Sequence, residues 1–196
     1  MTDLAPTRTL DGVELPVPGT WVIDPLHTSL AFEARHAAVT RMRGRFRSSS
    51  GQFTIAERPE ESSVEITIDA ASIDTIHPTA DEHLRGENFR DVEQYPELSF
   101  RSTSVRHVGG DRWQVIGDLT IRGITKPITL DATLNGVVAM SYGPKAKLGF
   151  TATGAFDRRD YGMEMNIPLP GGGVVVGNEV RLTLDVEADL PEDDAS

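Results

Sequence analysis

Five histidines and several carboxylates are the side chains in this sequence that could bind a metal or transfer a proton. His27 and His36 are nine residues apart, so on one regular strand they would face opposite sides. The sequence contains no His-x-His pair, H-E-x-x-H helix or cysteine ligand. A site that combines His27, His83 and Asp24 stays open as an alternative. We otherwise expect the histidines to hydrogen-bond at strand ends, and we predict no metal or other cofactor.

The motifs of nucleophilic catalysis and phosphate binding are also missing. Ser29 and Ser72 lie outside any G-x-S-x-G nucleophile elbow, although a triad built from distant residues would leave no local signature. The stretch PLPGGGVVVG (168–177) lacks the Gly-Lys-Ser/Thr ending of a phosphate loop, so we predict a hairpin loop. We predict no catalytic residues, because surface charge explains the candidate acid–base carboxylates better: Asp74, Asp81, Glu82 and Asp91.

Composition limits the class of partner. The 196 residues include 30 acidic and 19 basic side chains, a formal net charge of −11. This charge argues against nucleic acid or an anionic membrane surface as the main partner. The absence of cysteine excludes disulfides and a cysteine nucleophile. The chain therefore needs a hydrophobic core large enough to fold without cross-links, which its length allows.

The chain is predicted to form one domain over residues 19–188. Residues 1–18 contain three prolines without a period and are interpreted as a flexible N-terminal arm, and residues 189–196 as an acidic C-terminal tail. No apolar run approaches the roughly 18 residues of a membrane-spanning helix. The N-terminus has no basic start followed by an apolar stretch, so we expect a cytoplasmic location.

Alternation of apolar and polar residues is the dominant pattern. It runs through 64–70, 112–122, 128–134 and 180–186, and further strands are predicted at 28–36, 42–47, 51–56, 97–105 and 146–156. Strands with one apolar face are typical of antiparallel sheets. Turns are predicted at SSSG (48–51), GGDR (109–112) and RGITKP (122–127). About eight strands with short connections predict an up-and-down barrel or a sandwich.

The segment DEHLRGENFRDVEQYPELSF (81–100) does not alternate. Thr79 followed by Glu82 has the spacing of a capping box, which predicts the start of a helix. Gly86 interrupts this helix, Asn88 can cap a second turn, and Pro96 prevents continuation. The pattern predicts a broken helix that covers an opening, with its apolar side chains facing inward.

Six of the seven phenylalanines fall within predicted strands, at positions 32, 46, 53, 100, 150 and 156. An ordinary packed core would explain them equally well. A barrel of about eight strands, however, is just wide enough for side chains or one small ligand. Strands of 9 or 10 residues would span about 30 Å, which favours a long, thin, apolar ligand.

Several motifs follow one another along the chain: GTWVIDPLHTSLAFEARHAAV (19–39), MRGRFRSSSGQF (42–53), VEITIDAASIDT (64–75), DEHLRGENFRDVEQYPELSF (81–100), GDLTIRGITKPITL (117–130) and FDRRDYGME (156–164). Together, over about residues 19–188, they resemble the YceI-like family of polyisoprenoid-binding, lipocalin-like proteins. The resemblance implies an all-β fold: an extended lipocalin-like antiparallel eight-stranded β-barrel with a short broken helix at the opening. It also implies a barrel that holds an amphiphilic chain, without catalytic activity.

We therefore predict a protein that sequesters or carries a long-chain amphiphilic lipid of the polyisoprenoid type, an isoprenoid quinone or a polyprenyl compound, for transport or storage. An exposed strand edge would allow a homodimer. Two alternatives stay open: a metal-dependent enzyme acting on a lipid-like substrate, and a packed barrel that serves as an interaction domain. The predicted ligand-binding residues are Phe32, Phe46, Phe53, Ile66, Ile68, Leu84, Phe89, Tyr95, Leu98, Phe100, Val115, Leu119, Phe150 and Phe156.

Overall fold

The computed structural model describes residues 6–10 and 12–191, and strands dominate it. Within these residues the helical elements are α1 (Pro78–Arg85) and the short 3-10 helices η1 (Pro59–Glu61), η2 (Ala70–Ser72) and η3 (Arg158–Tyr161). The strands are β1 (Thr7–Leu10), β2 (Val13–Pro16), β3 (Gly19–Ile23), β4 (Ser29–His36), β5 (Thr40–Phe46), β6 (Ser49–Ile55), β7 (Ser63–Asp69), β8 (Ile73–Asp74), β9 (Glu97–Gly109), β10 (Arg112–Ile121), β11 (Ile124–Ala139), β12 (Ala146–Asp157) and β13 (Val176–Leu190).

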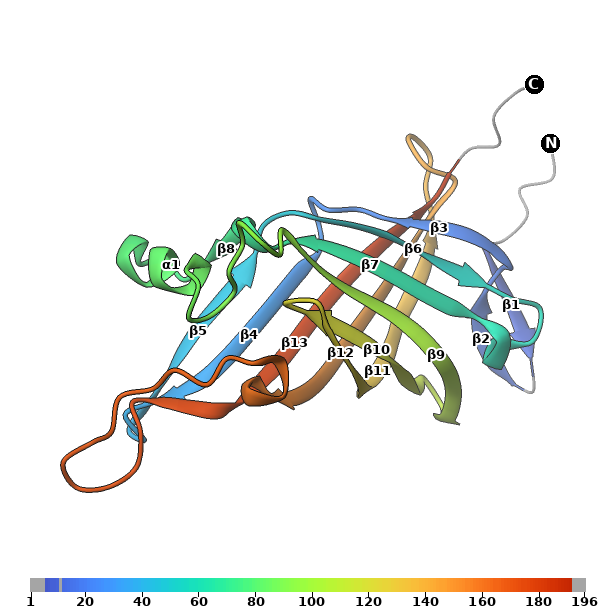
Figure 1. Cartoon of the computed structure of the whole chain (residues 1–196). Coiled ribbons are helices and arrows are strands. Elements are labelled where there is room, and N and C mark those ends of the chain that lie inside the picture. The colour runs from blue at the N-terminus through green and yellow to red at the C-terminus, as the bar shows by residue number, and fades with distance from the viewer. Residues whose placement is uncertain (1–5, 11, 192–196) are drawn as a thin grey trace.

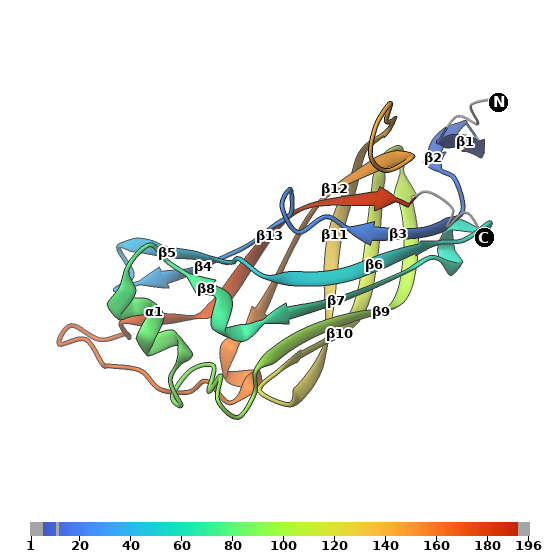
Figure 2. The same cartoon turned by 90° about the horizontal axis from the view of Figure 1, so that it is seen from above.

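Antiparallel pairing joins the longer strands into a closed barrel. The order is β12–β11–β10–β9–β7–β6–β3–β13, and pairing of β12 with β13 completes the ring (Figure 1). β13 pairs first with β4 and then with β3, so β4, β5 and β8 extend the sheet beyond the ring toward α1 (Figure 2). The predicted lipocalin-like eight-stranded antiparallel barrel is confirmed.

Alternation along the strands decides which side chains enter the barrel. Phe100 on β9 is 7% exposed, and it lies opposite Ile66 of β7 and Leu119 of β10. The next residue, Arg101, is on the outer face and pairs with Glu65 of β7 at 2.8 Å. Three neighbouring strands thus present apolar side chains inward and charged side chains outward, as their one-sided patterns predicted.

Two strand glycines allow aromatic rings to lie directly on the sheet. A Cβ at Gly117 of β10 would lie 2.5 Å from the Phe100 ring, and one at Gly44 of β5 would lie 2.5 Å from the Phe32 ring. Any other residue at these positions would displace the ring, so the close approach of ring and backbone explains why glycine is present.

Helix α1 covers one end of the barrel, as expected, but it begins differently. Pro78 occupies the first turn, His77 is the N-cap residue, and no side chain caps the helix. The predicted capping box was wrong, because proline fixes the start of the helix one residue before Thr79. The buried Asp81 instead accepts hydrogen bonds from the backbone N–H and the hydroxyl of Thr75, both at 2.7 Å. Among the described helices, none is long and apolar enough to cross a membrane.

The segment between α1 and β9 forms turns instead of the predicted second helical turn. Its backbone folds back on α1: the N–H of Arg90 donates to Leu84 at 3.1 Å and that of Val92 to Arg85 at 3.1 Å. The side chain of Arg85 donates to the carbonyls of Ala71 and Ile73 at 2.9 and 2.8 Å. These bonds fix the cover to the strand ends beneath it.

The N-terminal stretch differs from the arm without regular structure that we expected. β1 and β2 form an antiparallel hairpin, with Thr7 opposite Pro16 and Leu10 opposite Val13. Leu15 is buried against a core cluster that includes Trp21 and Trp113. Burial of this apolar side chain stabilises the docking of the hairpin on the barrel.

Two predicted turns are shorter than expected. β6 already begins at Ser49, so the turn near 48 does not include all of SSSG. The turn at 122–127 contains only Arg122 and Gly123, both with positive φ, and β11 begins at Ile124. The stretch 168–177 does form a hairpin loop, with a bridge between Pro168 and Val174.

A polar cluster joins β3, β12 and β13 near the closure of the barrel. The ammonium of Lys147 lies 3.2 Å from Asp24, 2.7 Å from Glu187 and 2.7 Å from Asp189. Burial disfavours the charge of Lys147, yet these three carboxylates raise its pKa. Burial also opposes ionisation of Asp24, but hydrogen bonds from His27, the Leu26 N–H and Lys147 overcome it and lower the Asp24 pKa to about 2. The hydrogen bond to Asp24 raises the pKa of His27.

These shifts predict the pH dependence of stability. A depressed carboxyl pKa adds stability above its unfolded value, about 3.9, and that stability is lost as the pH falls toward about 2. The raised pKa of His27 adds stability below about 6.5 that is lost as the pH rises through its folded value. Urea unfolding of Asp24→Asn should show a deficit in the free energy of unfolding relative to wild type at pH 5 that shrinks below pH 3. The deficit of His27→Gln should be full near pH 6 and should disappear as the pH rises through the folded-state pKa of His27, which lies above 6.5. A deficit that does not vary with pH in either variant would contradict this assignment.

Candidate functional site

An apolar cavity of about 110 Å³ lies inside the barrel, at the end where the β1–β2 hairpin docks. Aromatic and aliphatic side chains make up nearly all of its wall, and such cavities stay free of water and accept apolar guests. The lining residues are Arg8, Leu15, Pro16, Phe53, Ile55, Pro59, Ser62, Ser63, Val64, Ile66, Phe100, Val105, Trp113, Val115, Leu130, Ala132, Leu134, Phe150, Ala152, Leu184 and Val186.

Some predicted ligand-binding residues line this cavity and others do not. Those in its wall are Phe53, Ile66, Phe100, Val115 and Phe150. The remainder fill the half of the barrel beneath α1, where Phe32, Leu84, Phe89, Leu98, Leu119 and Phe156 are buried and Phe46 and Ile68 pack against them. Tyr95 is half-buried, with its ring next to Gly123. Whether any of them binds a ligand stays a prediction.

The sequence reasoning missed much of the cavity wall. Trp113, Leu130 and Leu184 each lie on the apolar face of a predicted strand, so the alternation already indicated that they point inward. Only the register between strands, which sequence patterns leave open, tells which inward residues share one level of the barrel. Leu15 and Arg8 had no such signal, because their hairpin was not predicted.

Two polar side chains at the cavity have donors without partners. The Nε of Arg8 and the indole Nε1 of Trp113 are buried and have no hydrogen-bond partner among residues 6–10 and 12–191. The other nitrogens of Arg8 are engaged: Nη1 lies 2.8 Å from Glu57, and Nη2 donates to the Ala56 carbonyl at 2.6 Å. A ligand oxygen at this end of the cavity would therefore find donors.

A second buried cation lies at the opposite end, in the segment that follows α1. Arg90 is 6% exposed, and its Nε and Nη1 make no hydrogen bond to any residue that the structure describes. Its guanidinium lies 5.6 Å from the ring centre of Phe46 and 6.0 Å from that of Phe32. Burial lowers the pKa of Arg90 to about 10. Cation–π contacts contribute about 0.5–2 kcal/mol, which is less than the several kcal/mol that burying a charge costs.

The residues of the late motif have structural roles. Arg158 is 3% exposed, and its guanidinium donates to the carbonyls of Gly177 and Met165 at 3.1 Å and to that of Met163. Tyr161 is fully buried with its ring edge-on to Phe156, and burial raises the pKa of Tyr161 to about 12. The motif thus fixes the chain that leads from β12 into the loop before β13.

The geometry does not assemble the metal site considered from the sequence. Among the described residues, ligand atoms of Asp24, His27 and Glu187 lie within 4.8 Å of one another. His83 is exposed on α1 and belongs to no such group. The ammonium of Lys147 already lies among the carboxylates, so it supplies the positive charge that a metal would bring.

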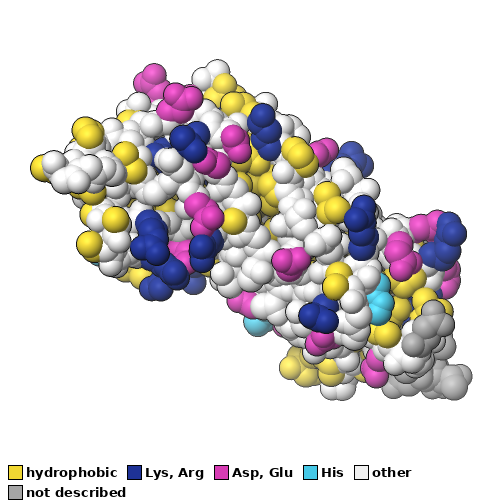
Figure 3. All heavy atoms as spheres, turned by 90° about the horizontal axis from the view of Figure 1, so that it is seen from below, with side chains coloured by type: hydrophobic (Ala, Val, Ile, Leu, Met, Phe, Trp, Pro, Cys, Tyr) yellow, Lys and Arg dark blue, Asp and Glu magenta, His cyan; other side chains and the backbone are white. Residues whose placement is uncertain are grey.

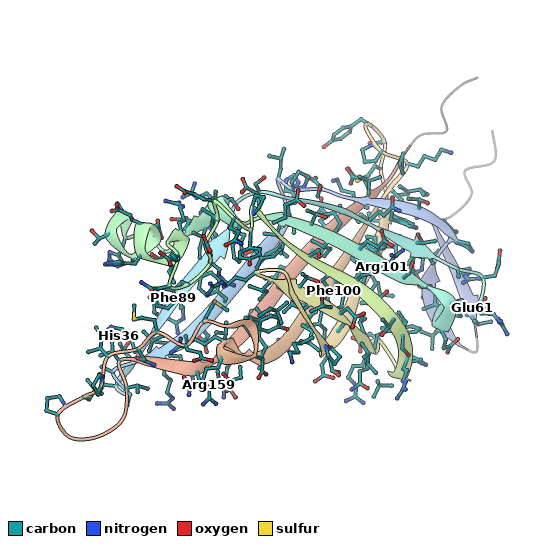
Figure 4. The ribbon with its side chains drawn as sticks, in the orientation of Figure 1. His36, Glu61, Phe89, Phe100, Arg101 and Arg159 are labelled. Atoms are coloured by element: carbon teal, nitrogen blue, oxygen red, sulfur yellow. The ribbon has the colours of Figure 1, made fainter. Side chains whose placement is uncertain are left out.

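Two of the other catalytic candidates, Ser72 and Asp74, also make structural contacts. Ser72 donates to the Asp69 carbonyl at 2.6 Å. Asp74 pairs with Arg45 and Arg47 at 3.4 and 2.8 Å. On the face shown in Figure 3, Lys and Arg side chains are interspersed with Asp and Glu. Phe100 and Arg101 (Figure 4) show the same division along one strand, with the ring inside the barrel and the charge outside.

Known proteins match both the sequence and the fold. The protein YceI of Escherichia coli O157:H7 is 36% identical over 162 residues, which cover 82% of this chain and 81% of that protein. The crystal structure of Burkholderia cenocepacia BcnA matches with a TM-score of 0.71 at 21% identity, covering 85% of this chain and 99% of that one. A polyisoprenoid binding domain from Saccharophagus degradans, implicated in plant cell wall breakdown, matches with a TM-score of 0.66 at 14% identity, covering 89% and 100%.

The two structural matches are too distant in sequence to carry more than the fold. The match to the YceI-like domain is of a different kind, because it extends over residues 21–188 and so spans the whole barrel. Together with the relative at 36% identity, it establishes that this chain belongs to the YceI-like family.

Proposed function

We propose that this protein binds a long-chain amphiphilic lipid of the polyisoprenoid type, an isoprenoid quinone or polyprenyl compound, inside the barrel, and that it sequesters or carries that lipid. The observation that carries the proposal is the apolar cavity enclosed by the barrel. A domain of the same fold from Saccharophagus degradans is named for polyisoprenoid binding, which is the class of ligand that we propose here. A transport or storage role, a homodimer and the cytoplasmic location stay predictions.

The dimensions of the barrel suit an extended chain. β11 has 16 residues and is therefore about 50 Å long at roughly 3.3 Å per residue. Each buried methylene contributes about 0.8 kcal/mol, so a few isoprene units can exceed the cost of ordering a flexible ligand. The cavity of about 110 Å³ can hold only part of such a chain. The remainder must displace side chains in the filled half of the barrel.

The alternative of a metal-dependent enzyme receives less support from the geometry. The histidines do not converge on the cavity. Among the described residues, two carboxylates of the one group of potential ligands, Asp24 and Glu187, already pair with the ammonium of Lys147. An interaction domain with a filled barrel would not need an enclosed apolar space. Metal analysis of purified protein distinguishes the metal-dependent enzyme from the lipid-binding protein. Stoichiometric zinc or iron that is lost in His27→Ala would favour the enzyme.

Binding can be followed through tryptophan, because Trp113 lines the cavity whereas the fully buried Trp21 does not. We expect organic extracts of native protein to contain one long-chain apolar molecule per chain. Titration of delipidated protein with a polyprenyl alcohol should change the fluorescence of Trp21→Phe but leave that of Trp113→Phe nearly unchanged. Absence of saturable binding with polyprenyl and acyl probes alike would eliminate the carrier function.

Phe100 and Phe156 provide a matched pair that distinguishes a cavity from a packed core. Both are buried, at 7% and 8% exposed, but only Phe100 lines the cavity. Phe156→Ala should reduce the free energy of unfolding by about 3–5 kcal/mol. Phe100→Ala should lose less, because part of its surface lacks protein partners. Lipid stabilises the native state, and this gain should be smaller in Phe100→Ala than in Phe156→Ala.

Denaturant unfolding of wild type and both variants, with and without lipid, measures the loss of unfolding free energy in each variant and the gain that lipid gives each of them. Equal losses in both delipidated variants, together with no stabilisation of the wild type by lipid, would indicate a filled barrel.

A further inference from the structure

The described part of the chain contains two deeply buried arginines, Arg90 and Arg158, whose guanidinium groups differ in their hydrogen bonding. Arg158 directs its guanidinium at three backbone carbonyls, those of Gly177, Met163 and Met165. Arg90 is buried to nearly the same extent, yet its Nε and Nη1 have no hydrogen-bond partner in the described chain. The fold can therefore satisfy a buried guanidinium, and at Arg90 it leaves two donors open.

No protein anion compensates Arg90 within the described residues. The buried carboxylate of α1, Asp81, already accepts two hydrogen bonds from Thr75. The groups that face Arg90 are instead the rings of Phe32 and Phe46, which lie 5.7 Å apart. Aromatic faces position a guanidinium without using its N–H groups, so its plane stays available for an oxyanion.

Arg90 lies where one end of a barrel ligand would be. The segment between α1 and β9 carries it, and its neighbour Phe89 is found beneath α1 (Figure 4). Phe32 belongs to the same apolar cluster as Phe100, whose other side lines the cavity. One cluster of buried apolar side chains thus extends from the cavity to the rings that contact the guanidinium.

We propose that Arg90 recognises an anionic head group, a phosphate or carboxylate, on the amphiphile whose chain extends through the barrel. The inference rests on the proposed lipid-binding function and deepens it. In this arrangement the chain lies toward the cavity, and the head group pairs with the open N–H groups of Arg90 beneath α1. Guanidinium groups suit this role because their paired donors match the oxygens of phosphate and carboxylate.

An anion fits better than a neutral acceptor. A quinone or amide oxygen would satisfy the free N–H groups but would leave a positive charge uncompensated in apolar surroundings. Only an anion removes both deficits. Arg90 should therefore favour an ionised ligand, so the protein should bind a polyprenyl phosphate or a fatty acid more tightly than the corresponding alcohol.

The test compares probes with one chain and different head groups. Delipidated protein is titrated with geranylgeranyl monophosphate, geranylgeraniol, a prenylated quinone of the same chain length, and inorganic phosphate, with calorimetry as the readout. Arg90→Met removes the charge at similar length, and Arg90→Lys retains it. Arg101→Met, on the outer face and paired with Glu65, is the control for net charge.

Wild type should bind the phosphate more tightly than the alcohol by roughly 10- to 100-fold, the range that charge-assisted hydrogen bonds to a buried group carry. Arg90→Met should abolish this preference while it retains binding of the alcohol. Arg90→Lys should keep part of the preference, and Arg101→Met all of it. Inorganic phosphate alone should bind weakly, because it lacks the chain.

Several outcomes would overturn the assignment. An unchanged preference in Arg90→Met would remove Arg90 from the head-group site and leave lipid binding intact. Inorganic phosphate that binds as tightly as the prenyl phosphate would indicate a site for the free anion, and a quinone that binds equally well would indicate a neutral acceptor. If no prenyl probe binds to wild type, the proposed function itself fails.

The unfolding midpoint provides a second readout, because an arginine with a purely structural role would give a different result from one that binds a head group. Removal of an uncompensated buried charge should leave the unfolding midpoint of ligand-free Arg90→Met equal to or above that of wild type. The phosphate probe should raise the midpoint of wild type more than that of the variant. A large drop in the midpoint of ligand-free Arg90→Met and Arg90→Lys alike would show that Arg90 serves packing only.

Discussion

The pairing of β12 with β13 is the constraint on which the other features of this molecule depend. Its register runs without a break from Ala146 opposite Leu190 to Asp157 opposite Glu179. Closure leaves every strand of the ring with one inner and one outer face, so the period of two must hold along all of them. It also creates an interior that side chains or a ligand must fill. Lys147 and its carboxylates stabilise this region from outside, where a charge cluster does not interfere with the apolar interior.

The interior is filled unevenly, and the connections explain why. At one end, α1 and the segment after it add Leu84 and Phe89 to the inward side chains of the strands, so that half is packed. At the other end, the β1–β2 hairpin adds Leu15, Pro16 and the stem of Arg8, and a cavity remains. Within the described residues, each end has an arginine with a buried, unpaired nitrogen, and the side chains between the two arginines are mostly apolar. A barrel with polar donors at its ends and an apolar middle suits an amphiphile.

The sequence predicted the barrel well because alternation reports a local property. The inward parity of Leu98 and Phe100 follows from the backbone alone, whatever the neighbouring strands are. Strand register and the docking of the hairpin depend on residues far apart in the sequence, so the alternation did not predict them. Trp113 and Leu15 meet at the cavity only once the strands are aligned and the hairpin has folded back. The burial of Arg90 was also missed, because an arginine among acidic residues has the pattern of a surface segment. The start of α1 was misplaced since Pro78 and a capping pattern at Thr79 compete, and the proline excludes the alternative.

β11 is about 50 Å long, whereas the cavity has a volume of about 110 Å³, so the long ligand that we propose has to displace side chains elsewhere in the barrel. Two tilted aromatic pairs stand along its path, Phe53 with Phe150 at 5.3 Å and Phe32 with Phe46 at 5.7 Å. Separating such a pair costs about 0.5–1.5 kcal/mol beyond the change in buried area. Two buried methylenes, at about 0.8 kcal/mol each, offset that loss. In the complex that we propose, chain length provides the affinity that opens the filled half of the barrel, and the head group determines which end of the ligand reaches Arg90.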